Sequence, residues 1–297
     1  MALERNQAQL KAYREQQAEA QELLKGRMGM IKHKIAVISG KGGVGKSTIT
    51  VNLAAAFAMQ GNRVGILDAD IHGPSVPRLL GLEGKHAKVG PTGVFPVEAE
   101  LGIKVMSIDF FMSEQMPTIW RGPLKMRAIK QFLTEIVWGE LDYLFIDLPP
   151  GTGDEPLSIA QLLPDLDGVV IVTMPSVLSS SIVKKAVTFA RTVKLPIIGV
   201  VENMSGFVCP HCGVKTEIFQ SGGGVRMAKD VGVAFLGSIP IDAKVGVDSD
   251  KGTPFVLSNK DSTATKAFME IVENVSKYLT KTRASSIGKK SGELKTP

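Results

Sequence analysis

The sequence has few of the features that mark secreted or membrane proteins. Its 297 residues include only two cysteines, which excludes a framework of several disulfide bonds. No apolar run approaches the roughly 18–20 residues that a helix needs to cross a bilayer, and the amino terminus has no signal-peptide pattern. Internal repeats are also absent. We therefore expect a cytoplasmic protein without a membrane partner.

The positive charge is concentrated at the two ends of the chain. Of the formal net charge of +6, residues 1–34 contribute +3 and residues 281–297 contribute +4, which leaves −1 for residues 35–280. Non-specific binding to nucleic acid depends on a basic surface, so this near-neutral core disfavours a nucleic-acid partner. The basic segment 281–297 also contains Ser and Gly, and we expect it to be a disordered tail.

Apolar, strand-like runs alternate with helix-like runs through most of the chain. The runs lie at residues 35–38, 64–67, 143–146, 169–172, 197–201 and 234–236, with another near Val105. This alternation predicts an α/β fold with a doubly wound, mainly parallel sheet. We expect one domain over residues 31–280, a helical extension over residues 1–30, and a loop or hairpin insertion at residues 81–98.

The most informative motif follows the first of these strands and fits the P-loop pattern G-x-x-x-x-G-K-[ST]. Glycines let several backbone N–H groups wrap a phosphate, and the start of the next helix adds partial positive charge. Lys46 is expected to reach the β- and γ-phosphates, and the Ser47 hydroxyl to bind Mg²⁺. The predicted ATP-binding residues of this loop are Gly40, Lys41, Gly42, Gly43, Val44, Gly45, Lys46, Ser47 and Thr48.

Carboxylates follow two other predicted strands. Asp68 and Asp70 come after residues 64–67, and Asp147 directly follows residues 143–146. Because ligands bind beyond the carboxyl ends of parallel strands, these acids are expected to converge on the P-loop. Asp147 is the predicted Walker B acid and a second ligand for Mg²⁺, which prefers oxygen donors. A helix cap is the alternative role for Asp68.

Cys209 and Cys212 form a C-x-x-C turn that ends at Gly213. Two thiolates at this spacing can bind zinc or an iron–sulfur cluster. A disulfide is disfavoured in a reducing cytosol, and a redox pair usually begins a helix in a βαβ unit. Such metal sites usually need four ligands, so a two-fold dimer would complete the set. His211 is an alternative third ligand, and the spacing leaves zinc and iron–sulfur open.

The loop contains an additional lysine, Lys41, five positions before Lys46. This early lysine makes the motif resemble the deviant Walker A class of P-loop NTPases. That class includes the nitrogenase iron protein and the MinD and ParA ATPases. The resemblance implies that Lys41 reaches the partner's nucleotide across a dimer and acts in hydrolysis together with Lys46. It also places Asp70 in the switch that positions the attacking water, and residues 149–151 in a second switch.

Within that class the chain resembles the Mrp/ApbC-type iron–sulfur cluster carrier ATPases over residues 31–280. The matching segments are residues 68–75, 120–123, 147–154, 201–206, 209–213 and 237–242. The resemblance implies slow ATP hydrolysis, a 4Fe–4S cluster held between two subunits by Cys209 and Cys212, and acceptor apoproteins as partners. It further implies that Asn203, Pro240 and Asp242 contact the adenine. Residues 174–179 differ from the corresponding start in bacterial members.

A positioning or partition ATPase of the MinD or ParA type, with a structural zinc at the C-x-x-C turn, is the alternative. MinD-type membrane binding needs an amphipathic carboxy-terminal helix, but beyond residue 280 the only sizeable apolar residues are Ile287 and Leu294. Partition on DNA needs a basic surface. Neither function explains the two cysteines. We therefore expect a homodimeric, ATP-dependent iron–sulfur cluster carrier.

Overall fold

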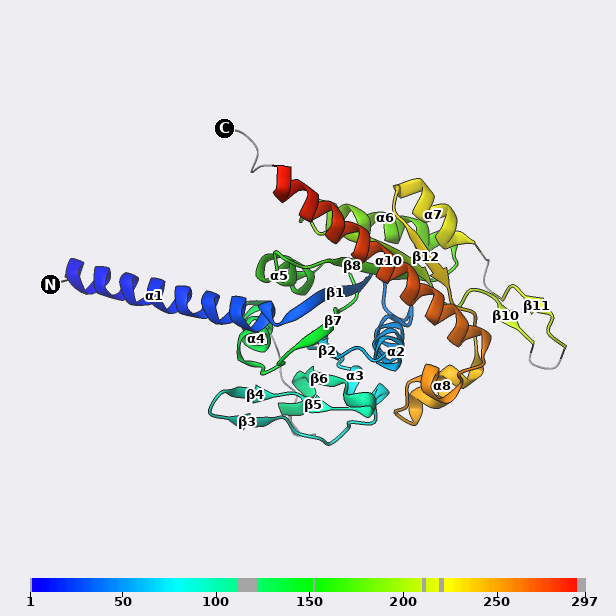
Figure 1. The fold of residues 1–297 in the computed structure, drawn as a ribbon, viewed down its shortest axis with the longest axis horizontal. Helices are drawn as coiled ribbons and strands as arrows, with labels where there is room; N and C mark the ends of the chain where they lie inside the picture. Colours follow the sequence, from blue (N-terminus) through cyan, green and yellow to red (C-terminus); the bar gives the residue numbers. More distant parts are fainter. Residues whose placement is uncertain (1, 112–121, 152, 210–211, 219–221, 293–297) are drawn as a thin grey trace.

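An eight-stranded sheet forms the centre of the computed structural model, which describes residues 2–111, 122–151, 153–209, 212–218 and 222–292 (Figure 1). The strands lie in the order β12-β9-β8-β1-β7-β2-β6-β5, and every neighbouring pair is parallel except β5 and β6. Their bounds are β1 Ile31–Ser39, β2 Val64–Asp68, β5 Val97–Glu98, β6 Lys104–Ser107, β7 Leu141–Asp147, β8 Gly168–Thr173, β9 Ile197–Glu202 and β12 Phe235–Ser238. The predicted doubly wound, mainly parallel sheet is confirmed.

The central strands are buried on both faces. Every residue of β2 and β8 is buried, and in β1 only Lys32 is exposed. Strands covered on both sides need apolar residues at consecutive positions rather than at alternate ones. The continuous apolar runs in the sequence are explained by this double coverage.

Helices on the two faces reflect the path of the chain through the sheet. The chain runs from β1 outward to β2 and β6, then returns through β7 to β8, β9 and β12. Because right-handed crossovers in opposite directions place helices on opposite faces, α2 and α10 cover one face, whereas α6 and α7 cover the other. The helices are α2 Lys46–Met59, α3 Val76–Leu79, α4 Gly122–Glu135, α5 Asp154–Leu162, α6 Val177–Thr192, α7 Gly223–Val231, α8 Ala243–Asp250, α9 Phe255–Ser258 and α10 Thr263–Gly292.

The amino-terminal helix α1 (Ala2–Gly29) extends away from the body of the domain, and its carboxyl end lies beside α4 (Figure 1). Leu24 and Met28 are buried there. Lys34 is also buried, and its Nζ donates to the Met28 carbonyl at 3.2 Å and pairs with Asp165 at 3.0 Å. A cation at the carboxyl end of a helix satisfies carbonyls that have no partner within the helix.

Two small hairpins project from the sheet. Strands β3 (Lys88–Gly90) and β4 (Gly93–Phe95) are antiparallel, which confirms the hairpin predicted within residues 81–98. Strands β10 (Phe207–Val208) and β11 (Lys215–Thr216) form the second hairpin, which joins β9 to α7. Two 3₁₀ turns, η1 (Glu100–Gly102) and η2 (Ile108–Phe111), flank β6.

The carboxy-terminal segment differs from its prediction. Helix α10 continues without a break to Gly292, so residues 281–292 are helical where a disordered tail was expected over residues 281–297. Ala, Lys and Arg in this stretch are good helix formers, and they extend a helix already anchored on the sheet. Residues 293–297 lie outside the described part of the chain. None of the described helices is long and apolar enough to cross a membrane.

Candidate functional site

The loop between β1 and α2 is shaped to surround an anion. Gly43 and Gly45 have φ angles of 77° and 80°, a left-handed region that glycine adopts without steric cost. Gly45 is also the N-cap residue of α2, so the free amides of the helix start point into the loop. A cavity of about 290 Å³ lies against the loop and is lined by Ser39, Gly42, Gly43, Val44, Gly45, Lys46, Ser47, Thr48, Asp70, Ser75, Leu79 and Pro150.

Three polar side chains of α2 contact the Asp147 carboxylate. Lys46 Nζ lies 2.6 Å from Asp147 Oδ2, and Ser47 Oγ donates to the same oxygen at 2.5 Å. Thr50 Oγ1 donates to Asp147 Oδ1 at 2.7 Å. Asp147 is fully buried and Lys46 nearly so. The ion pair therefore lies in a region of low dielectric, where charge-assisted hydrogen bonds are strong.

The chemistry of this donor set fits Mg²⁺. The ion prefers oxygen ligands and takes one or two from the protein, with water or phosphate oxygens completing its octahedron. Ser47 and Asp147 bring a hydroxyl and a carboxylate oxygen to one point at the base of the loop. Thr50, three residues after Ser47 on the same helix face, was missed by the sequence reasoning, although its spacing could have indicated it.

Asp68 lies beside Asp147, because the two residues are in register on the neighbouring strands β2 and β7. It is fully buried. Its Oδ2 accepts hydrogen bonds from the amides of Ser75 and Val76 at 3.1 and 3.2 Å, at the start of α3. Burial, and then the nearby charge of Asp147, raise the pKa of Asp68. These contacts agree with the helix cap that was the alternative role for Asp68. They also hold the loop that contains Asp70.

Asp70 and Lys41 lie at the two sides of the nucleotide loop. Asp70 lines the 290 Å³ cavity, and its Oδ1 accepts from the Gly73 amide at 3.2 Å. Lys41 is exposed, and neither it nor Gly40 is among the residues lining the cavity. Asp70 therefore lies in the wall of the cavity, whereas Lys41 is exposed outside it.

A second cavity, of about 460 Å³, adjoins the first and shares Gly45 and Thr48 with it. Its size and mixed polarity suit a nucleoside. The lining residues are Gly45, Thr48, Ile49, Asn203, Met204, Ile239, Pro240, Ile241, Asp242, Val245, Gly246, Ser249, Asp250 and Phe268. All three residues predicted to contact the adenine are therefore brought to one cavity next to the P-loop.

Asn203 and Asp242 also have structural contacts within this cavity. Asn203 Nδ2 donates to the carbonyl of Val44 in the P-loop at 2.9 Å. A Cβ at Gly45 would collide with the Asn203 side chain, so glycine is needed there for close approach as well as for its φ angle. Asp242 caps α8 by accepting from the Lys244 amide at 2.9 Å. Only part of each polar side chain remains for a ligand.

The two cysteines lie in the turn of the β10–β11 hairpin. Cys209 is half-buried and Cys212 is exposed, and no disulfide joins these two described residues. The turn is closed by backbone hydrogen bonds from Cys209 to Val214 at 3.0 Å and from Gly213 to Cys209 at 2.9 Å. Within the described residues, no group of three or more His, Cys, Asp or Glu side chains could hold a metal ion. His211 lies outside those residues.

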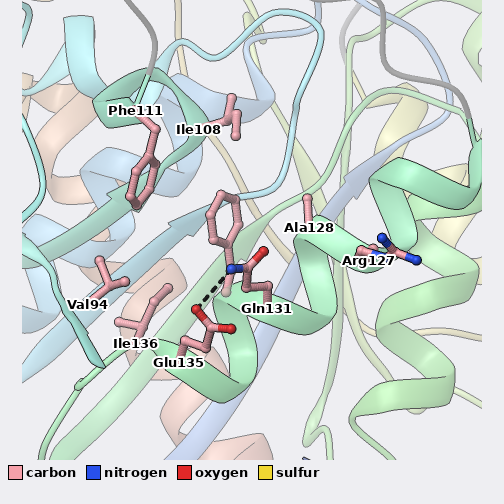
Figure 2. A pocket seen from close by; sticks show the side chains of 9 residues that line it. Val94, Ile108, Phe111, Arg127, Ala128, Gln131, Glu135 and Ile136 are labelled. Carbon is pink, nitrogen blue, oxygen red and sulfur yellow. Dashed lines mark hydrogen bonds between the residues drawn. The ribbon is translucent and has the colours of Figure 1, made fainter. Parts of the chain in front are cut away.

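An apolar cavity of about 180 Å³ lies away from the predicted site residues, between β4, η2 and α4 (Figure 2). Phe111 and Phe132 stack there with ring centroids 6.0 Å apart. Gln131 and Glu135 form a hydrogen bond of 2.9 Å beside it. Its lining is mainly hydrocarbon, apart from Arg127, Gln131 and Glu135.

Similarity to known proteins agrees with this geometry. Residues 30–276 match the family described as "ParA: NUBPL iron-transfer P-loop NTPase". A protein of Methanocaldococcus jannaschii named iron-sulfur cluster carrier protein is 54% identical over 249 residues, covering 84% of this chain and 85% of the relative. A relative with the same name from Aquifex aeolicus is 49% identical over 251 residues, covering 84% and 68% respectively.

Solved structures share the fold. A nucleotide-binding protein from Archaeoglobus fulgidus, in complex with ADP and with cobalt found by PIXE, has a TM-score of 0.73 and 44% identity, covering 84% of this chain and 96% of that one. The cell-division ATPase MinD of Pyrococcus furiosus has a TM-score of 0.62 and 21% identity, covering 83% and 99%. At that identity, the second match shows the fold alone.

Proposed function

This chain belongs to the NUBPL iron-transfer family of P-loop NTPases, and from that premise we propose that it is an ATP-dependent iron–sulfur cluster carrier that works as a homodimer. The observation that carries the proposal is the presence in one chain of a P-loop and a turn with two thiols. An iron–sulfur cluster is the cargo of this protein, and ATP is its switch.

ATP binds with its phosphates against the P-loop and its base in the 460 Å³ cavity. Lys46 donates to the β- and γ-phosphates, and the amides at the start of α2 bind the same anion. Ser47 and Asp147 would hold Mg²⁺, which would neutralise charge on those phosphates. Asn203, Pro240 and Asp242 contact the adenine from the wall of the second cavity.

Hydrolysis is slow and requires the dimer. Asp70 orients the attacking water beside the γ-phosphate, which agrees with its position in the wall of the phosphate cavity. Lys41 extends from the exposed side of the loop to the partner's nucleotide. There it stabilises charge on the transferred phosphoryl group, as an arginine finger does. Because the partner supplies this cation, ATP is hydrolysed only after the dimer has formed.

The cluster is bound on the dimer axis. Each chain contributes two thiolates, Cys209 and Cys212, whereas a 4Fe–4S cubane needs one ligand for each of its four irons. Two turns related by two-fold symmetry supply four. A cluster held by exposed turns at an interface can pass to an acceptor apoprotein when the turns separate.

Anaerobic reconstitution with iron and sulfide tests this proposal directly. We expect about one 4Fe–4S cluster per dimer, or about two irons per subunit, measured by iron and sulfide analysis, visible absorption and native mass spectrometry. A cluster-loaded monomer contradicts the bridging arrangement. A stoichiometric zinc that iron cannot replace favours a structural metal site instead.

A further inference from the structure

The two residues at the end of β9 lie between the nucleotide loop and the cysteine turn. Glu202 ends the strand, Asn203 follows it, and the chain reaches Cys209 six residues after Asn203. Asn203 contacts the P-loop through its hydrogen bond to Val44. From the sequence, Asn203 was predicted to contact the adenine, and no role was predicted for Glu202.

Glu202 holds both stems of the segment that contains the cysteines. Its carboxylate is fully buried. Oε1 accepts from Ser205 Oγ at 2.6 Å, on the stem that leads into β10. Oε2 accepts from the amide of Gly224, at the start of α7 and on the stem that leads out. A carboxylate at a helix amino terminus is stabilised by the helix dipole, which makes this a favourable place for a buried charge.

The fit between Glu202 and α7 is tight. A Cβ built on Gly224 would lie 2.9 Å from the Glu202 Cβ and 3.0 Å from the Phe235 ring. Gly224 is therefore the residue that lets the helix start approach the carboxylate. Glu202 is therefore hydrogen-bonded to the chain both before and after the hairpin, at Ser205 and at Gly224.

The wall of the 460 Å³ cavity is hydrogen-bonded to the same segment. The Ser205 amide donates to the Ile239 carbonyl at 2.8 Å, and the Ile241 amide donates to the Gly206 carbonyl at 2.7 Å. Phe207, the first residue of β10, also pairs with Ile241. Ile239 and Ile241 both line the 460 Å³ cavity. The hairpin thus has contacts with the phosphate loop through Asn203 and with the base cavity through its own backbone.

We propose that Glu202 is a positioning residue for the Cys209–Cys212 turn, and that the Glu202–Asn203 junction couples the turn to the nucleotide loop. When ATP binding orders the P-loop, the hydrogen bond to the Val44 carbonyl holds Asn203 in place. The neighbouring residue Glu202 is then held as well, together with the Ser205 and Gly224 groups that it accepts hydrogen bonds from. Thermodynamic linkage makes the effect reciprocal, so ordering the two thiols by a metal raises ATP affinity by the same factor. The coupling to cluster binding rests on the proposed function, but the positioning of the thiols does not.

Alkylation of the apoprotein tests the junction without any cluster. The chain has only two cysteines, so iodoacetamide labelling followed by mass spectrometry reports on Cys209 and Cys212 alone. In the wild type, Mg-ATP slows alkylation by about fivefold. Glu202→Gln loses one of its two accepted hydrogen bonds, which raises the rate without nucleotide by about tenfold and brings the ATP effect close to one.

Ser205→Ala provides a milder variant that removes only the hydroxyl bonded to Oε1. Ser205 is not among the residues lining either nucleotide cavity, so its ATP affinity stays within about twofold of the wild type while its alkylation rate rises by about fivefold. Glu140→Gln is the control for loss of charge, since Glu140 is exposed and pairs with Arg63 far from the hairpin. It should alkylate like the wild type.

The possible outcomes separate the two proposals. Wild-type alkylation rates in both Glu202→Gln and Ser205→Ala overturn the positioning role. Wild-type thiols that do not respond to ATP overturn the coupling. A dimer that fails to assemble a cluster, but whose thiols respond to ATP through Glu202, overturns the proposed function and leaves the junction standing.

Discussion

The P-loop and the acids around it lie at the carboxyl ends of central strands of the sheet. The two thiols lie instead on a hairpin of two-residue strands outside the sheet. Asp147 and Lys46 are buried and bonded to each other, while Cys212 is exposed. The residues that line the first site all come from one chain, and the proposed dimer adds only Lys41 of the partner subunit. The second presents two ligands where a metal centre needs four. In the proposed function, this difference would let the first site bind ATP tightly while the second releases its cluster.

The largest effect on cluster content is expected from the cysteines. Cys209→Ser or Cys212→Ser removes two of the four ligands in a dimer, so cluster content after reconstitution should fall by at least about tenfold. In the cluster-free protein ATP affinity should stay unchanged, because the thiols do not line either nucleotide cavity. Iron analysis and equilibrium ATP binding measure the two effects. Thr216→Ser on the same hairpin is the control, and full cluster in either cysteine variant would refute the bridging site.

Lys41→Ala should separate binding from hydrolysis. The side chain is exposed and outside the phosphate cavity, so ATP binding by the monomer should change little. The turnover number should fall by about 10³-fold, the lower range for a cation supplied in trans. Phosphate release at several protein concentrations measures this. Normal turnover in the variant would end the proposal that Lys41 acts across the dimer.

Lys46→Ala should weaken the nucleotide site itself. Loss of charge-assisted hydrogen bonds to phosphate should lower ATP affinity by about 100-fold. The variant also leaves the buried Asp147 carboxylate without its cation, so the free energy of unfolding should fall by about 3 kcal/mol. Isothermal titration and urea unfolding measure these quantities. Cluster content should change much less than ATP affinity, and an equal loss of both would mean that the two sites are not built separately.

The smallest effect on ligand binding is expected from pH, which acts here on stability. Burial raises the pKa of Asp68 from 3.8 to about 8, so folding favours its neutral form. Its contribution to stability is present below pH 3.8 and is lost as pH rises towards about 8. Asp68→Asn removes this titration, so the wild type should lose several kcal/mol more stability than the variant between pH 4 and 8, about 1.4 kcal/mol for each pH unit of that range. Urea unfolding of the nucleotide-free protein measures the difference, and parallel pH curves would contradict it.

The fold and much of the nucleotide site could be predicted because their patterns are local. Apolar runs gave the strands to within a few residues, and the P-loop motif predicted both the turn and the helix α2. The carboxy-terminal tail was different, because composition alone does not reveal that an anchored helix continues through residues 281–292. Asp68 was expected near the P-loop, with a helix cap as its alternative role, and the sequence could not decide between them because it does not show which amides surround a carboxylate.

The sequence by itself determined the P-loop, the acids at the strand ends and the number of thiols per chain. Each of these depends on residue type and spacing over a few positions. Only the tertiary structure decided that Asn203 contacts Val44, 159 positions away, and that Glu202 holds the start of α7. Contacts of this kind depend on how strands order themselves in the sheet and on how closely glycines let backbones approach. Burial then sets the chemistry, because the same carboxylate group is a cap, a metal ligand or a clamp according to the donors that folding brings to it.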